Sequence, residues 1–329
     1  MKNSESKTKC ALIIGISGQD GAYLSEFLLK KNYRVVGSSR DAQLSDFQGL
    51  RHLNILNKIE TVSISPMDFR SVLDNVKMIE PDEIYNLSGQ SSVGLSFNQP
   101  VDTFNSISVS TLNLLEAIRF LNPKIKFYNA SSGEMFGEAE SKPADENTPF
   151  NPKSPYAVAK AAAHWQVSVY RESYGIFSCS GILYNHESPL RPSRFVTKKI
   201  IRAACNIRCG NKEKLVLGNI DIMRDWGYAP EYVEAMWKML SQQSPEDYVI
   251  ATGKTYRLRE FIDSAFRYFD LNWKDYVFFD NKLLRPSEIM VGSANPNKAK
   301  KLLGWEAKYD MHDIVKIMIE DELEKIKGN

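Results

Sequence analysis

Two short stretches of the sequence contain side chains that could carry out chemistry on a substrate. Tyr156 and Lys160, in SPYAVAK, are four residues apart on a predicted helix, and this spacing brings both side chains to one face. An ammonium group near a phenol favours the phenolate, so Tyr156 could act as a base near neutral pH. Ser131, Ser132 and Glu134, in KFYNASSGE, end a predicted strand, at the sheet edge where α/β folds bind ligands. A Tyr–Lys pair at this spacing is common by chance, but its combination with these groups indicates an enzyme site.

A run of three glycines predicts a site for a phosphate-containing ligand. Gly15, Gly18 and Gly21 lie three apart in ALIIGISGQDGAYLSEFLLKK, where an apolar strand gives way to an amphipathic helix. Such a junction can place backbone N–H groups and the helix N terminus against a pyrophosphate, which glycine allows to approach closely. A tight turn without a ligand is the alternative. The strand, the glycines, the helix and a second strand, YRVVGSSR, follow the order of a dinucleotide site, which favours the ligand.

The end of the second strand helps to choose the dinucleotide. An acidic residue at this point would hold the 2′-hydroxyl of NAD, whereas an arginine accommodates the 2′-phosphate of NADP. The sequence has Ser38, Ser39 and Arg40, with Asp41 following. Arg40 favours NADP, and Asp41 keeps NAD as the alternative.

The elements that must position these residues alternate between strand and helix. From residue 10 to about 185, short apolar runs such as CALIIG, EIYNLS and FSCSGILY alternate with helical patterns such as FRSVLDNVKMI and TLNLLEAIRFL. Strands that are apolar on both faces predict a parallel sheet covered by helices on both sides. The predicted fold class is therefore α/β, with a doubly wound, Rossmann-like parallel sheet.

A second, smaller α/β region is expected after this sheet. The Pro- and Arg-rich NHESPLRPSRF changes the rhythm, VTKKIIRAACNIRC and DWGYAPEYVEAMWKML predict helices, and DYVIATG predicts a strand. We expect residues 1–184, completed by about 215–251, to form the dinucleotide-binding domain. Residues 185–214 and 252–329 are expected to form the second domain.

Composition excludes several other classes of protein. The net charge of the 329 residues is +2, which gives no footprint for nucleic acid or for an acidic membrane. The start, MKNSESKTK, is polar and lysine-rich, and no stretch is apolar enough to span a bilayer, so a cytoplasmic location is expected. Of the four cysteines, Cys205 and Cys209 could share one helix face, but without a second pair nearby no metal site is predicted.

Ordered sequence blocks over nearly the whole chain resemble a known family. The chain is similar to the extended short-chain dehydrogenases/reductases and, within that group, most similar to the GDP-mannose 4,6-dehydratases. The matching blocks include GISGQDGAYL, FNQP, ENTPF, SPYAVAK, YRESYGI, GILYNHESP, FVTKKI, LGNIDIMRDWG, YVEAMW and VIATG. NHESP and RDWG are typical of this subfamily rather than of the whole group.

The resemblance implies a conversion of GDP-D-mannose to GDP-4-keto-6-deoxy-D-mannose with NADP. It makes Tyr156 the base at C4, Lys160 its activator, and Ser132 a hydrogen-bonding partner of the sugar near C4. Glu134 would remove the C5 proton and protonate the hydroxyl that leaves C6. A dehydratase of another GDP-sugar is one alternative. A GDP-4-keto-6-deoxy-sugar reductase or epimerase is a second alternative, against which Glu134 argues. A catalytically silent NADP-binding protein is a third, and the presence of all four residues, Ser132, Glu134, Tyr156 and Lys160, argues against it.

The resemblance also implies two binding sets. The cofactor set comprises Gly15, Ser17, Gly18, Gln19, Asp20, Gly21, Arg40, Leu87, Gln90, Ser91, Tyr156, Lys160, His186 and Arg191. The substrate set, which makes the second domain the nucleotide-sugar-binding one, comprises Ser91, Ser132, Glu134, Tyr156, Asn185, Val196, Lys199, Gly218, Arg224, Arg285 and Glu288.

Several positions depart from the family pattern. The usual STSE is SSGE here, so Ser132 replaces a threonine and Gly133 is expected to loosen the turn before Glu134. ESPLRPSRF also differs from the usual form of that loop, which keeps a related GDP-sugar open. SSRDAQLSDFQ replaces the serine-rich loop that helps to build the family's tetramer. A homo-oligomer is still expected, as a dimer rather than as a tetramer.

Overall fold

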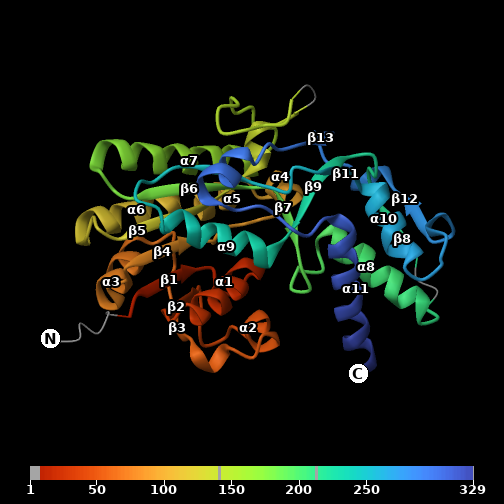
Figure 1. Cartoon of the computed structure of the whole chain (residues 1–329), viewed down its shortest axis with the longest axis horizontal. Coiled ribbons are helices and arrows are strands. Elements are labelled where there is room, and N and C mark those ends of the chain that lie inside the picture. Colours follow the sequence, from red (N-terminus) through yellow and green to blue (C-terminus); the bar gives the residue numbers. More distant parts are fainter. Residues whose placement is uncertain (1–7, 140–141, 212–213, 329) are drawn as a thin grey trace. The chain divides into compact units, whose positions relative to one another are not determined.

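The computed structural model describes residues 8–139, 142–211 and 214–328, and Figure 1 shows their ribbon. The lysine-rich start falls largely on residues 1–7, outside the described residues. The strands are β1 (Cys10–Ile14), β2 (Arg34–Ser39), β3 (Glu60–Ser63), β4 (Glu83–Asn86), β5 (Lys126–Ser132), β6 (Ser178–Leu183), β7 (Asn185–Glu187), β8 (Leu215–Leu217), β9 (Met223–Tyr228), β10 (Tyr248–Ile250), β11 (Thr255–Arg257), β12 (Val277–Phe279) and β13 (Val291–Gly292).

The α-helices are α1 (Gln19–Lys30), α2 (Gln48–His52), α3 (Phe69–Ile79), α4 (Val93–Asn98), α5 (Pro100–Phe104), α6 (Ser110–Leu121), α7 (Pro155–Tyr174), α8 (Val196–Arg208), α9 (Ala229–Leu240), α10 (Leu258–Arg267) and α11 (Met311–Gly328). Short helical turns are η1 (Leu56–Lys58), η2 (Asn105–Val109), η3 (Gly133–Phe136), η4 (Trp273–Asp275), η5 (Asn281–Leu283) and η6 (Ala299–Leu303). Every helix in the described residues is too short or too polar to cross a bilayer.

The main sheet has seven strands in the order β10-β6-β5-β4-β1-β2-β3. β1 pairs in parallel with β2 and β4, β2 with β3, and β4 with β5. The strand order reverses direction at β1, so the gap between the ends of β1 and β4 is the topological switch point where such sheets bind ligands. The predicted doubly wound, Rossmann-like sheet is confirmed.

By its contacts the chain divides into two compact units, each described by itself. The first comprises Met1–Ser131, Pro155–Gly181 and Val233–Asp247, and the second comprises Ser132–Ser154, Ile182–Tyr232 and Tyr248–Asn329. These bounds differ from the predicted 1–184 with 215–251, chiefly because residues 132–154 and 215–232 lie in the second unit. Ala144 forms a parallel bridge with Ala294, and the Ala139 N–H donates to the Val291 carbonyl at 3.1 Å. Contacts this far apart in sequence leave no trace in strand–helix alternation.

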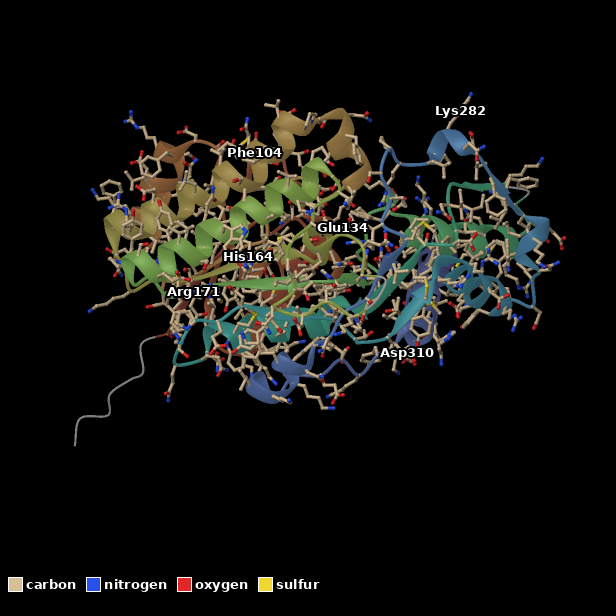
Figure 2. The ribbon with its side chains drawn as sticks, turned by 90° about the horizontal axis from the view of Figure 1, so that it is seen from above. Phe104, Glu134, His164, Arg171, Lys282 and Asp310 are labelled. Carbon is tan, nitrogen blue, oxygen red and sulfur yellow. The ribbon has the colours of Figure 1, made fainter. Side chains whose placement is uncertain are left out.

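In the first unit, helices cover both faces of the sheet (Figure 1). α3, α6 and α7 pack in series on one face, and α1 lies on the other, where its Phe27 meets Trp237 with ring centroids 5.7 Å apart. Strand residues such as Leu12, Ile14 and Phe127 are fully buried between these layers, as their apolar runs predicted. Arg171, labelled on α7 in Figure 2, donates to the Asp247 carboxylate at 3.1 and 2.6 Å.

In the second unit, β9 is the central strand of a small sheet. It pairs with β7 and β13 in parallel and with β11 in the opposite direction. The prediction of a helix starting at DWG was therefore wrong, and the helix starts only at Ala229. Residues 224–227 are buried, and the Asp225 carboxylate accepts the N–H groups of Thr252 and Gly253 at 2.9 and 2.7 Å. Pairing with distant strands overrides the helical pattern here.

Candidate active site

The turn between β1 and α1 is built from backbone that packs on backbone. Gly15 has φ of +92°, and a Cβ there would lie 3.0 Å from the Leu87 carbonyl oxygen. A Cβ at Gly21 would lie 2.6 Å from the Gly15 carbonyl oxygen. A Cβ at Gly18 would meet only that same oxygen, at 3.4 Å, which is an ordinary contact. The turn itself therefore requires glycine at positions 15 and 21. At position 18 the protein leaves space for a side chain, so a ligand can approach the backbone there.

The open side coincides with the start of α1. Ser17 and Gly18 are exposed, and the helix has no side-chain cap on its first N–H groups. Gln19 and Asp20 begin the helix, with the Gln19 amide donating to the Asp20 carboxylate at 3.1 Å. A helix N terminus without a cap, beside a glycine, fits the pyrophosphate of a dinucleotide.

At the end of β2 the two candidate cofactor-selecting residues have different roles. The Asp41 carboxylate accepts the N–H groups of Gln43 and Leu44 at 2.9 and 3.0 Å, so it closes a local turn. Arg40 is exposed, and it makes no hydrogen bond or ion pair with any residue of the described chain. The guanidinium is thus available to a ligand while the carboxylate is engaged.

The loop after β4 supplies Leu87, Gln90 and Ser91. The Leu87 N–H donates to the Ile14 carbonyl at 2.9 Å, which fixes this loop beside the glycine turn. The Gln90 amide donates to the Ser92 carbonyl at 2.8 Å, so this side chain braces the start of α4. Ser91 is exposed.

Tyr156 and Lys160 lie on α7, as their spacing predicted. Both are buried, and the Lys160 Nζ is 5.8 Å from the centroid of the Tyr156 ring. The ammonium donates to the Ala130 carbonyl at 2.7 Å. Burial lowers the pKa of Lys160 to about 8, against the opposing effect of the Asp20 carboxylate. At neutral pH most of this lysine therefore remains charged.

Ser132 and Glu134 belong to the second unit. Ser132 caps the turn η3, because its hydroxyl accepts the Glu134 N–H at 3.3 Å. The Glu134 side chain, labelled in Figure 2, is 18% exposed, so its carboxylate keeps an opening. Its Oε1 lies 3.9 Å from the Nε of Arg224.

Arg224 is the centre of a buried charge network. Its guanidinium donates to the carbonyls of Met223 and Ile289 at 2.9 and 2.8 Å, and it pairs with Glu288 at 3.1 Å. Arg285 pairs with the same carboxylate at 3.1 Å. Burial raises the pKa of Glu288 although both guanidiniums oppose this.

The remaining predicted residues surround α8 and β7. The buried His186 ring stacks on Tyr232, with centroids 4.6 Å apart, and its Nδ1 is 2.7 Å from the Tyr184 carbonyl oxygen. Arg191 pairs at 3.0 Å with the buried Glu187, so much of its charge is already compensated. Four further residues of the substrate set lie in β7, at the start of α8 and after β8: Asn185, Val196, Lys199 and Gly218. Lys199 is exposed, and its ammonium has no partner in the described chain.

The structure thus gathers the predicted residues into two groups. The first unit holds the glycine turn, the ends of β2 and β4, and the Tyr–Lys pair, and the second unit holds Ser132, Glu134 and the residues that surround α8. No cluster of three potential metal ligands occurs among the described residues.

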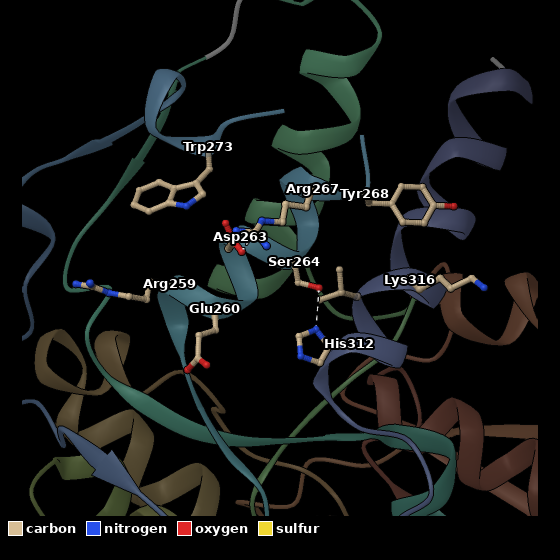
Figure 3. A pocket seen from close by; sticks show the side chains of 10 residues that line it. Arg259, Glu260, Asp263, Ser264, Arg267, Tyr268, Trp273, His312 and Lys316 are labelled. Atoms are coloured by element: carbon tan, nitrogen blue, oxygen red, sulfur yellow. Dashed lines mark hydrogen bonds and ion pairs between the residues drawn. The ribbon is translucent and has the colours of Figure 1, made fainter. Parts of the chain in front are cut away.

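A separate groove of about 660 Å³ lies in the second unit between α10 and α11 (Figure 3). It contains none of the predicted residues. Arg267 pairs with Asp263 at 2.9 Å, and the Ser264 hydroxyl lies 3.2 Å from His312 Nδ1. These polar groups satisfy one another, so the groove presents little unpaired charge.

Sequence reasoning missed two residues next to the site. Tyr184 and Glu187 stand in blocks that were interpreted as strand and loop. The Tyr184 hydroxyl donates to the Ser293 carbonyl at 3.0 Å, and Glu187 accepts the Thr197 hydroxyl at 2.6 Å. Neither contact leaves a signal in the sequence, because the partners lie 109 and 10 residues away.

The fold is the one found in solved structures of short-chain dehydrogenases/reductases that act on nucleotide sugars. Solved structures with the same fold include a dTDP-glucose 4,6-dehydratase from Bacillus anthracis in complex with NAD, with a TM-score of 0.84 at 18% identity, covering 97% of this chain and 98% of that one. RMD from Pseudomonas aeruginosa, in complex with NADPH, has a TM-score of 0.81 at 21% identity, covering 97% and 100%. Relatives of this fold therefore bind nicotinamide cofactors.

Sequence comparison identifies the family within that class. Residues 12–318 match the family model described as GDP-mannose 4,6 dehydratase. GDP-mannose 4,6 dehydratase 1 of Arabidopsis thaliana is 46% identical over 331 residues, which cover 97% of this chain and 91% of the relative. GDP-mannose 4,6-dehydratase of Vibrio cholerae is 41% identical, with 98% and 95% covered. The chain belongs to the GDP-mannose 4,6-dehydratase family, and the predicted class of nucleotide-sugar hydro-lyase is confirmed.

The glycine turn generates a paired prediction. Gly18→Ala should leave the melting temperature nearly unchanged and weaken binding of the dinucleotide, because its methyl group meets the ligand rather than the protein. Gly21→Ala should destabilise the fold by about 1–3 kcal/mol, because its methyl group overlaps backbone. Thermal unfolding and titration of the cofactor measure both effects. Equal losses of stability in the two variants would contradict the assignment of Gly18 to the ligand.

Proposed function

We propose that the chain converts GDP-D-mannose to GDP-4-keto-6-deoxy-D-mannose through Tyr156, Lys160, Ser132 and Glu134. The observation that carries this proposal is Glu134, a partly exposed carboxylate on a capped turn. A reductase or epimerase of 4-keto sugars needs the tyrosine and the lysine but no such carboxylate. The family membership supports GDP-mannose over another GDP-sugar.

The first step is the oxidation of C4, for which the cofactor would supply a hydride acceptor and later return the hydride to C6, while C5 takes back a proton in place of the one taken from the C4 hydroxyl. Tyr156, as phenolate, takes the proton of the C4 hydroxyl. The Lys160 ammonium stabilises that phenolate, and its bond to the Ala130 carbonyl keeps it in place. Ser132 would hydrogen-bond the sugar near C4.

The second step is the loss of water across C5 and C6. The ketone at C4 makes the C5 proton acidic, so a carboxylate is a sufficient base. Glu134 takes this proton and delivers one to the hydroxyl that leaves C6. One group can serve both purposes because the proton that it gains is the proton that it gives.

Cationic side chains are proposed to hold the diphosphate of the substrate. Lys199 is exposed without a partner, and Arg285 is partly exposed beside Glu288. Both suit a diphosphate, which prefers charge-assisted donors. Arg224 is buried and already bonded to two carbonyls and a carboxylate, so we propose that it mainly organises this part of the site.

NADP is the proposed cofactor. The free guanidinium of Arg40 suits a 2′-phosphate, whereas Oδ1 of the Asp41 carboxylate holds a local turn by accepting two backbone N–H groups. Arg40 is therefore the residue that supports NADP over NAD. We keep His186 and Arg191 in the proposed cofactor set, as residues that support the residues in contact with the cofactor.

A homo-oligomer, as a dimer in the cytoplasm, is also proposed. α6 and α7 pack on each other and expose a set of large apolar side chains: Leu112, Phe120, Val158, Trp165 and Val169. Apolar side chains gathered on one helical pair are typical of a protein interface. A second copy can cover this surface with the same surface of its own.

Replacing Glu134 tests the dehydration step. Glu134→Gln keeps size and hydrogen bonding but abolishes proton transfer, so product should fall by about 10²–10⁴-fold while GDP-mannose and NADP still bind. Mass spectrometry of the product, lighter by one water, and cofactor absorbance measure the two steps separately. Dehydration at the wild-type rate would make Glu134 structural and favour the reductase.

Replacing Arg40 tests the cofactor. Arg40→Ala should weaken NADP far more than NAD, because only NADP has the 2′-phosphate charge to lose. Arg70→Ala, at an exposed arginine on α3, is the matched control and should change neither affinity. Calorimetric titration measures both cofactors. Equal losses for the two, or a wild-type preference for NAD, would reject the assignment.

Replacing Trp165 tests the dimer. Trp165 is 59% exposed, and Trp165→Glu places a charge within the proposed interface, so the dimer should dissociate at micromolar concentration. Phe279→Glu is the control, because Phe279 is 57% exposed on β12 of the other unit. Light scattering after size exclusion gives the mass. A monomeric wild type, or a Trp165→Glu dimer, would contradict the proposed surface.

A further inference from the structure

Gly133 stands where the turn has no room for a side chain. A Cβ at this position would lie 2.6 Å from Cε2 and 2.8 Å from Cζ of the Tyr184 ring, closer than real Cβ contacts allow. Its φ lies outside the left-handed region, so the backbone does not itself require glycine. The requirement for glycine here is therefore one of space, and it is set by one aromatic ring.

That ring is held on several sides. Tyr184 is 6% exposed, and its hydroxyl donates to the Ser293 carbonyl at 3.0 Å. Its N–H donates to the Ile250 carbonyl at 3.0 Å, and its own carbonyl oxygen lies 2.7 Å from Nδ1 of His186. Burial raises the pKa of the Tyr184 hydroxyl, and the nearby carboxylates of Asp225 and Glu134 add to the shift, so it stays a donor. A ring anchored at both ends cannot easily yield to a neighbour.

The turn that rests on this ring carries the carboxylate of the site. Glu134 follows Gly133 directly, and its N–H is fixed by the Ser132 hydroxyl at 3.3 Å. Glu134 Oε1 lies 3.9 Å from Arg224 Nε, and the side chain is 18% exposed, so it has a cationic neighbour and one open side. A shift of the turn by a few tenths of an ångström would move the carboxylate with it.

We propose that Tyr184 is a positioning residue for Glu134, and that Gly133 is the matching gap that lets its ring support the turn. The inference rests on the proposed role of Glu134 in proton transfer. It also replaces the expectation that Gly133 loosens the turn, because the ring occupies the space that a side chain would take. The family usually has a serine at position 133, whereas in this chain Gly133 packs directly on the ring of Tyr184.

A double-mutant cycle tests the pair. Gly133→Ser should slow elimination by about 10²-fold, the size of effect that a misplaced catalytic group produces, and change KM for GDP-mannose by less than about threefold. Tyr184→Ala makes room, so the added cost of Gly133→Ser in that background should nearly vanish. Tyr184→Phe keeps the ring and should retain most of the wild-type rate. Gly94→Ser is the control, because a Cβ there meets no atom within 4 Å.

The decisive measurement is the ratio of the two steps. With a displaced Glu134, the absorbance of reduced cofactor should accumulate after mixing while product is delayed, because oxidation at C4 does not need the carboxylate. A merely structural defect would slow both steps equally. Melting temperatures of all variants separate misfolding from misplacement, and the double variant supplies the result if Gly133→Ser alone does not fold.

The outcomes separate this inference from the proposed function. Suppose that Glu134→Gln blocks elimination. If Gly133→Ser then eliminates at the wild-type rate, or slows oxidation and elimination equally, the positioning role is overturned and the proposed function stands. A cost of Gly133→Ser that persists unchanged in Tyr184→Ala also overturns it. If Glu134→Gln eliminates normally, the function fails first, and the inference fails with it.

Discussion

Contact between backbone and backbone at the carboxyl end of β1 is the constraint on which the first unit depends. Gly15 meets the backbone of Leu87, and Gly21 meets that of Gly15, so the turn, the helix and the loop after β4 fix one another without side chains. On β2, a Cβ at Gly37 would overlap the Ile16 side chain, so the second strand also lies close to this turn. The open side proposed for a pyrophosphate is the space that these contacts leave beside Gly18. Rigid neighbours of this kind keep the first N–H groups of α1 oriented before any ligand arrives.

The second unit is organised by charged side chains that are buried and paired with groups of opposite charge or with hydrogen-bonding partners. Arg224 reaches two carbonyls and the Glu288 carboxylate, and Glu187 receives both Arg191 and Thr197. Removing one partner from such a network leaves a buried charge uncompensated, which costs more than the network contributes. The same arrangement gives the site a surface on which few charges remain open to a ligand. Lys199 is one of the few, which supports its proposed place in the binding of a diphosphate.

The sequence predicted the first unit well because its signals are local. A glycine run between strand and helix, buried apolar strands and a Tyr–Lys pair four residues apart each depend on neighbours in the chain, and the order of the sheet confirms the doubly wound fold. The second unit was harder. DWG lies in a strand because β9 is paired on distant partners, and residues 132–154 lie with residues from 182 onward for the same reason. The engagement of Asp41 and the packing of Tyr184 on Gly133 could not be read from residue types, since both depend on which atoms meet in space.

The fit between Gly133 and Tyr184 has an evolutionary consequence. In this chain a Cβ at 133 and the ring at 184 would occupy the same space, so a change at one position alters the room at the other. Substitutions at the two positions are then epistatic: a lineage that passes from one pairing to the other must first accept the smaller residue at one position before it can enlarge the other. A chimaera that borrows only the turn around Glu134 from a relative would inherit half of this pair.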